Sequence, residues 1–252
     1  MPPLWDAVRY KVDQTAQKGQ FILTGSATPN HKGILHSGAG RIARLRMRPM
    51  SLRESGDSSG KVSLEKLCRG ELTPAMTGEV DLKKLIELII RGGWPGSLGL
   101  PLEQAALLPA EYLNAVIDDD VYHVDGVKRD TQKMRLLLRS LARNESTTVT
   151  NKTLMKDIKA VDGEDIDGNT VAAYLDIFKR LFLTDNQLPF SSGIRSSVRV
   201  KQAENLLEIK RQIEEDPKGK PPAVLCVLCG IANAAYQRPD GVFVVPVTAL
   251  RP

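Results

Sequence analysis

The sequence predicts an α/β protein whose middle is mainly helical. Apolar residues recur at helical spacing through the middle, whereas short apolar runs bounded by glycine, serine or proline occur near both ends. The chain has 252 residues, of which 42% are hydrophobic and 26% charged, a composition typical of globular proteins and not of disordered, collagenous or coiled-coil chains. That length is enough for one or two domains, each with a hydrophobic core.

A helix, two strands and a polar loop are expected in the first 60 residues. Apolar residues at helical spacing between residues 4 and 18 predict a short helix that Gly19 ends. The apolar run 21–23 is typical of a buried strand that runs into a turn, and residues 41–48 alternate with period two, which predicts a second strand with one basic face. The polar loop at residues 55–60 is expected to be flexible.

Helical patterns follow from residue 82 onwards. Asp81 is placed to cap a helix that ends at Gly92-Gly93, and a second helix is expected over residues 102–117 despite its internal proline. Three shorter amphipathic helices then make a candidate helix-turn-helix, followed by a polar wing or linker at residues 185–201. The three helices are expected at residues 128–143, 151–160 and 169–183.

The end of the chain is expected to form a helix at residues 203–215 and strands at residues 223–229 and 242–247. Glu208-Ile209-Lys210 in that helix is similar to the Glu-x-Lys of metal-dependent nucleases. Helical spacing, however, turns the acid and the amine away from one another, which favours a solvated helix face. The two cysteines of the first strand lack further metal ligands nearby, which favours buried structural thiols.

No complete nucleotide-binding or metal-binding motif occurs in the sequence. A phosphate-binding P-loop requires G-x-x-x-x-G-K-[ST], whereas the nearest string, Gly56 to Val62, is one residue short and ends in valine. No apolar strand ends in the acidic pair that would hold magnesium in such an ATPase. Asp118-Asp119-Asp120 could bind a cation, but adjacent acids after an apolar helix are more typical of its exposed end. Neither a nucleotide-hydrolysing site nor a metal site is therefore expected.

Several strings spread over the chain closely resemble the bacterial AAA-type ATPases that carry a C-terminal domain of unknown function. The strings begin at Phe21 (FILTGSATP), His36 (HSGAGR), Met47 (MRPMSLRE), Arg91 (RGGWPG) and Ala235 (AYQRPDGV). The resemblance implies a partial AAA-type (RecA-like) core, a helical lid, a winged-helix block and a short α/β remnant of a nuclease-like domain. These four parts are expected at residues 1–60, 61–127, 128–201 and 202–252.

The resemblance also implies two absences. The P-loop and the acidic Walker B strand of the family have no counterpart here, and the chain skips the nuclease-like strands between about Lys201 and Gln202. The chain therefore resembles a truncated and internally shortened ATP-binding protein that does not hydrolyse ATP by itself. ATP and Mg²⁺ are expected as cofactors from the resemblance alone.

The resemblance implies catalytic roles for three residues near the N-terminus. Thr24 and Ser26 match the sensor 1 position, where a hydroxyl orients water near the terminal phosphate. Arg41 matches an arginine finger, since a guanidinium can neutralise charge spread over several phosphate oxygens. The alternatives are a strand-end turn for Thr24 and Ser26, and a plain exposed arginine for Arg41.

The helical block resembles the winged-helix region of the same family and provides the alternative function, a non-catalytic DNA-binding or protein-binding module. The helix over residues 169–183 would be the recognition helix, with Lys179 and Arg180 on its outside. Arg195, Arg199 and Lys201 in the following loop could contact phosphates. The chain has 35 basic and 30 acidic residues, so attraction to DNA depends on where the charge lies. Possible partners are DNA, another protein or a second copy of the chain.

Membrane insertion is not expected. No window approaches the ~20 apolar residues of a membrane span, and the N-terminus lacks a basic segment leading into an apolar run. Three cysteines are too few for a disulfide framework, which agrees with a reducing compartment. A cytoplasmic protein is therefore expected.

Overall fold

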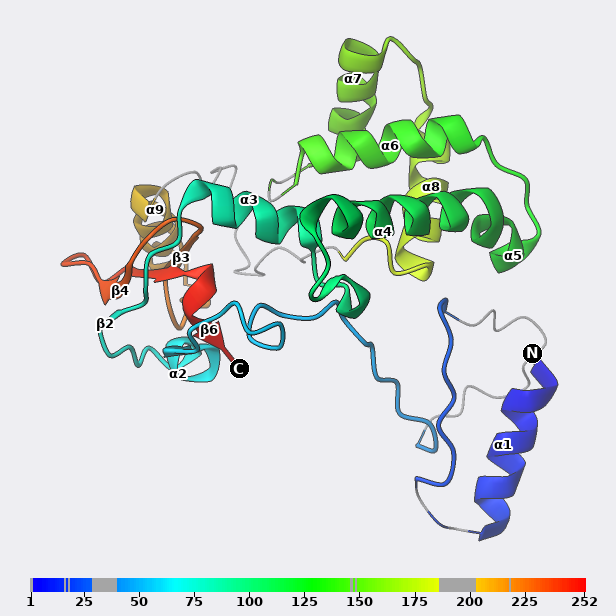
Figure 1. Cartoon of the computed structure of the whole chain (residues 1–252), viewed down its shortest axis with the longest axis horizontal. Coiled ribbons are helices and arrows are strands. Elements are labelled where there is room, and N and C mark those ends of the chain that lie inside the picture. The colour runs from blue at the N-terminus through cyan, green and yellow to red at the C-terminus, as the bar shows by residue number, and fades with distance from the viewer. Residues whose placement is uncertain are drawn as a thin grey trace. The chain divides into compact units, whose positions relative to one another are not determined.

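The computed structural model describes residues 2–15, 17, 19–28, 40–145, 147, 149–185, 203–217 and 219–252. These residues form a mixed α/β protein, shown in Figure 1. The helices are α1 (Pro2–Thr15), α2 (Leu64–Cys68), α3 (Leu82–Arg91), α4 (Leu102–Ala115), α5 (Val121–Asp125), α6 (Thr131–Arg143), α7 (Asn151–Asp162), α8 (Gly168–Arg180) and α9 (Ala203–Glu215). The strands are β1 (Val62–Ser63), β2 (Ala75–Met76), β3 (Cys226–Cys229), β4 (Ala234–Gln237), β5 (Phe243–Pro246) and β6 (Leu250–Arg251).

The chain divides into two compact units. The first contains Met1–Met47 and Glu111–Gln187, and the second contains Arg48–Ala110 and Leu188–Pro252. We call them the helical unit and the mixed unit, because the strands of the described chain all lie in the second. Helix α4 begins in the mixed unit and ends in the helical unit.

The core of the helical unit is built by α6, α7 and α8 together with the π-helical turn Val116–Asp120 that precedes α5. Each of the three helices contributes fully buried side chains, among them Leu137, Leu154, Ile158, Val171 and Phe178. Their N-termini are capped in the ordinary way. The side chains of Asp130, Thr150 and Asp167 accept hydrogen bonds from backbone amides of the first turns of α6, α7 and α8 respectively.

The mixed unit is organised around a sheet of order β2-β4-β5-β3, in which β3 runs parallel to β5 and the other neighbours are antiparallel. A separate parallel pair joins β1 to β6, with Val62 opposite Leu250. Val62, Leu67, Ala235, Phe243 and Val245 are buried together. This core therefore joins residues near position 65 to residues from the C-terminal end of the chain.

The helices predicted between residues 82 and 183 are confirmed, as are the strands predicted at residues 223–229 and 242–247. The strands predicted at residues 21–23 and 41–48 are wrong, because the described residues there form no strand and Ile22, Leu45 and Met47 are 90%, 97% and 93% exposed. A strand requires a neighbour to pair its backbone amides and carbonyls, and no described strand lies beside these segments.

Candidate functional site

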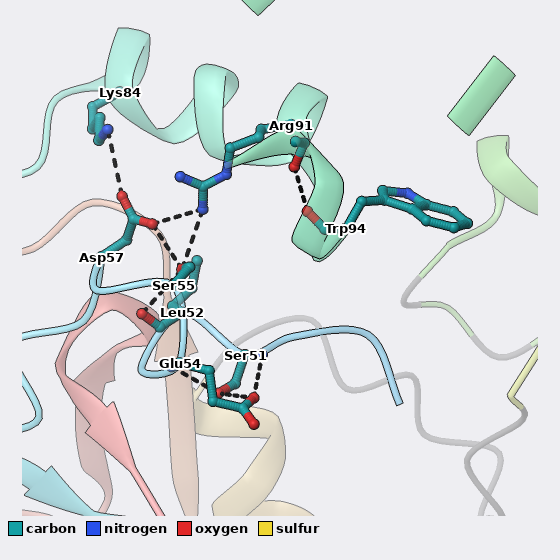
Figure 2. Close-up of polar contacts among 9 residues, drawn as sticks. Ser51, Leu52, Glu54, Ser55, Asp57, Lys84, Arg91 and Trp94 are labelled. Carbon is teal, nitrogen blue, oxygen red and sulfur yellow. Dashed lines mark hydrogen bonds and ion pairs between the residues drawn. The ribbon is translucent and has the colours of Figure 1, made fainter. Parts of the chain in front are cut away.

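The polar loop at residues 51–60 is held against α3, as Figure 2 shows. Arg91 of α3 donates from Nη2 to Asp57 Oδ2 at 2.6 Å and to Ser55 Oγ at 3.2 Å, and Ser55 Oγ donates to the same Asp57 oxygen at 2.7 Å. Lys84 Nζ, about two turns earlier on α3, lies 3.5 Å from Asp57 Oδ1. The side chains of Asp57 and Arg91 are only 12% and 17% exposed. The loop predicted to be flexible is therefore fixed by a largely buried ion pair.

The charge balance of this cluster favours ionised Asp57. Burial raises the pKa of the Asp57 carboxyl, but hydrogen bonds from Arg91 and Ser55 and the positive charges of Arg91 and Lys84 outweigh it, so the pKa is lowered. The base beside Ser55 is the Asp57 carboxylate, and its lowered pKa makes it too weak to activate the Ser55 hydroxyl as a nucleophile. The arrangement thus stabilises the mixed unit and has no evident catalytic chemistry.

The same loop cannot act as a phosphate cradle in this conformation. A P-loop presents free backbone amides to phosphate oxygens, whereas the amides of Asp57 and Ser58 both donate to the Leu52 carbonyl at 2.8 and 2.9 Å. The Ser59 amide donates to the Thr248 carbonyl at 2.8 Å, and the Gly60 amide donates to Ser58 Oγ at 3.2 Å. These donors are already used within the protein.

Replacing Arg91 by methionine is expected to cost about 2–3 kcal/mol of unfolding free energy at pH 7, since it leaves Asp57 charged and largely buried beside Ser55 and Lys84 alone. The lowered pKa of Asp57 means that its contribution is present above its ordinary pKa of 3.8 and is lost as pH falls through the lower folded value. The cost should therefore shrink below about pH 4. Urea unfolding at pH 7 and pH 3 measures it, and a cost independent of pH would contradict this assignment. Arg69→Met, which removes an exposed partner of Glu65, is the control and should change little.

A second candidate site is the outer surface of α7. Lys152, Lys156 and Lys159 are exposed and stand at positions i, i+4 and i+7, which places them within about 60° of one another around a helix. Lys159 pairs with the exposed Asp165 at 3.0 Å, while Lys152 and Lys156 form no ion pair with any described residue. We call these three residues the α7 lysine stripe.

The acids of α7 are paired with α6. Arg143, at the end of α6, donates to Asp157 Oδ2 from Nη2 at 2.7 Å and to Asp162 Oδ2 at 2.8 Å. The hydrogen bond from Arg143, supported by Ser140, lowers the pKa of Asp157. Helix α7 therefore has its negative charges neutralised by α6 and its positive charges directed to solvent.

The predicted recognition helix has an outer face that is small and nearly neutral. The exposed residues of α8 are Gly168, Asn169, Ala172, Ala173, Asp176 and Lys179. Lys179 thus lies outside, as the sequence indicates. Arg180 instead faces the end of α5, where Nη2 donates to the Val124 carbonyl at 3.4 Å and Nη1 lies 3.9 Å from Asp125 Oδ2.

Arg180 therefore takes part in a contact inside the helical unit. The hydrogen bonds that Arg129 donates lower the pKa of Asp125 to about 2, despite partial burial, with help from the Val127 amide and the charge of Arg180. Only 11% of the Arg129 side chain and 23% of the Asp125 side chain are exposed. This geometry gives Arg180 a supporting role for α5, whereas Lys179 forms no ion pair with any residue that the structure describes.

The other predicted site residues are not brought together with these clusters. Thr24 and Ser26 are exposed in a segment without a strand, and Arg41 pairs with Asp13 of α1. Arg195, Arg199 and Lys201 lie outside the described residues. Sequence reasoning missed the Asp57–Arg91 pair, whose partners are 34 positions apart. It also missed the α7 lysine stripe, although the i, i+4, i+7 spacing was visible.

Charged residues of the acidic run at residues 118–120 and of the Glu-x-Lys string at residues 208–210 form local ion pairs. Asp118 accepts two hydrogen bonds from Arg135 at 3.0 Å, and Glu208 pairs with Arg211 while Lys210 pairs with Glu214. Within the described ranges no group of three His, Cys, Asp or Glu residues could hold a metal ion. Across the same ranges, every helix is too short or too polar to span a bilayer.

Residues 82–206, just under half of the chain, match the model of a domain of unknown function, DUF8612. The matched segment begins at α3 and includes the whole of α6, α7 and α8. No curated protein and no solved structure matches the chain.

The match to DUF8612 contradicts the resemblance to AAA-type ATPases, because the matched model describes a domain of unknown function and no ATPase family is supported. The structure agrees, since the strands expected for the AAA-type core are missing from the described N-terminal residues. The roles expected for Thr24, Ser26 and Arg41, and the ATP and Mg²⁺ that accompanied them, rested on that resemblance and have no other support.

Proposed function

We propose that α6, α7 and α8 form a winged-helix-like module that binds duplex DNA without catalysis. The carrying observation is the segregation of charge on α7, with Lys152, Lys156 and Lys159 exposed and Asp157 and Asp162 paired to α6. Lys152 and Lys156 do not have to leave an ion pair, so they can neutralise backbone phosphates and release the counterions bound to them. The α7 lysine stripe thus supplies the sequence-independent part of the affinity.

Helix α8 supplies a surface that fits the same module. Its outer residues Asn169, Ala172 and Ala173 are small, so the first half of α8 can approach a groove closely, and Lys179 stands at its far end. The single exposed acid of that face, Asp176, offsets Lys179. Residues 185–201, expected to form the wing, contain Arg195, Arg199 and Lys201 and a single acid, Asp185. Phosphate contacts from α7 would place α8 at the DNA.

The test measures fluorescence anisotropy of a labelled 20-base-pair duplex with the full chain between 50 and 300 mM salt. The logarithm of the association constant should fall linearly with the logarithm of the salt concentration. Lys152→Gln/Lys156→Gln should reduce the magnitude of the salt slope by about 2 and the affinity at 0.1 M salt by roughly 10- to 100-fold. Lys66→Gln/Lys220→Gln removes two exposed charges from the mixed unit as a matched control and should leave the slope unchanged.

Two outcomes would overturn the proposal. Affinity that does not fall with salt would exclude phosphate contacts, and an unchanged slope in Lys152→Gln/Lys156→Gln would exclude the α7 lysine stripe. Since both lysines are exposed and outside the core, the variant should retain the circular dichroism and melting temperature of the parent chain. If either of the two overturning outcomes is observed, binding of a protein partner on α8 becomes the preferred function.

A further inference from the structure

Strand β3 is an edge of the four-stranded sheet. In the described part of the chain, β3 pairs only with β5, and the sheet ends there. The Phe243 amide donates to the Leu225 carbonyl at 2.9 Å, so in a parallel ladder the backbone groups of Leu225, Val227 and Cys229 face β5. The amides and carbonyls of Cys226 and Leu228 therefore point away from the sheet and can accept another strand.

The sequence around this edge lacks the features that normally prevent strand addition. Residues 221–237 contain no charged side chain, and no proline occurs between Ala223 and Gln237. Protein edges are usually protected by lysine, proline or a bulge. Leu228 and Ile231 are instead 54% and 56% exposed, so an apolar surface accompanies the open backbone edge.

We propose that β3 pairs edge to edge and antiparallel with β3 of a second copy, which joins the two sheets. A second copy suits this edge for two reasons. It brings another uncharged strand, so that no like charges meet across a two-fold axis, and with Val227 on that axis the outward backbone groups of Cys226 face those of Leu228 in the other copy. Because the outward backbone groups belong to Cys226 and Leu228, hydrogen bonds form when each of these residues faces Cys226 or Leu228 of the other copy.

Sedimentation equilibrium of the full chain from 1 to 200 μM tests this association. The parent chain should shift with concentration from its monomer mass of 27.7 kDa toward twice that value. Leu228→Lys, which places a charge on the open edge, should raise the dissociation constant at least tenfold. Met76→Lys is the matched control, since Met76 is 64% exposed on β2 at the opposite edge of the same sheet, and it should dimerise like the parent.

A backbone test separates strand pairing from general apolar association. Leu228→Pro removes an amide that faces away from β5, so it should abolish dimerisation while leaving the β3–β5 ladder intact. Hydrogen exchange of residues 224–230 in the parent should slow as the protein is concentrated, and the Met76→Lys control should behave likewise. A monomeric parent at 200 μM, or equal dimerisation of Leu228→Lys and Met76→Lys, would overturn the proposal. A monomer whose residues 224–230 are protected at every concentration would assign the edge to a segment of the same chain.

Discussion

Replacing Phe178 by alanine is expected to lower the free energy of unfolding of the helical unit by about 3–5 kcal/mol. Phe178 is fully buried, and it lies in the cluster that Leu137 of α6, Ile158 of α7 and Val171 of α8 share. Truncation removes apolar surface from the core and leaves a cavity among the packed side chains of α6, α7 and α8. A loss of this size is comparable to the entire stability of many small domains.

Urea unfolding followed by circular dichroism at 222 nm measures the change caused by Phe178→Ala. Phe21→Ala is the matched control, because Phe21 is 45% exposed and outside the cluster, and it should change the midpoint little. Similar losses in the two variants would show that Phe178 is not part of a packed core. The DNA-binding proposal depends on this result, since the α7 lysine stripe is positioned by packing of α6, α7 and α8.

The helical unit was predictable because its information is local. Buried residues recur at helical spacing in each of α6, α7 and α8, and Thr150 and Asp167 mark the starts of α7 and α8 with capping side chains. The predicted end of α8, at residue 183, was less accurate. The helix stops at Arg180 although the apolar pattern continues, because Phe182 adopts a left-handed backbone with φ of 57°.

The strands were harder to predict because their partners are distant in sequence. Val62 pairs with Leu250, and Met76 pairs with Ala234, so β1 and β2 exist only once the end of the chain has folded onto them. A two-residue strand carries no periodicity of its own. Conversely, the apolar run 21–23 has the right composition for a strand but no partner among the described strands, and Ile22 is exposed.

The parts of the candidate site that depend on residues close in sequence could be predicted, whereas the parts that depend on distant residues could not. The exposure of Lys179 follows from the helical period alone, and so would that of the α7 lysine stripe. The inward direction of Arg180 depends on Asp125 at the end of α5, which is 55 residues away. Likewise, only the fold brings Arg91 to Asp57 and uses the loop amides that a phosphate would need.

Replacing Gly93 by alanine is expected to lower the stability of the mixed unit by about 2–4 kcal/mol through steric overlap and a lost hydrogen bond. A Cβ at this position would lie 2.6 Å from the Met50 carbonyl oxygen, 2.9 Å from the Met50 nitrogen and 2.8 Å from Pro49 Cβ. The Met50 amide donates to the Gly93 carbonyl at 2.8 Å, so this close approach is itself a hydrogen-bonded contact. Since the obstructing atoms belong mainly to the backbone, no rotamer change can relieve the overlap, and the two segments must separate.

Gly96→Ala is the matched control, because the nearest atom to a Cβ there is Leu108 Cδ1 at 4.0 Å, and its stability should change by less than about 0.5 kcal/mol. Thermal unfolding compares the two variants. Separation of Met50 from Gly93 also moves the loop that carries Asp57 away from Arg91. The pKa of Asp57, lowered in the parent, should therefore return toward its ordinary value in Gly93→Ala, and the stability of that variant should depend less on pH between 4 and 2. Equal melting temperatures for Gly93→Ala and Gly96→Ala would mean that the close approach of these segments does not hold the loop against α3.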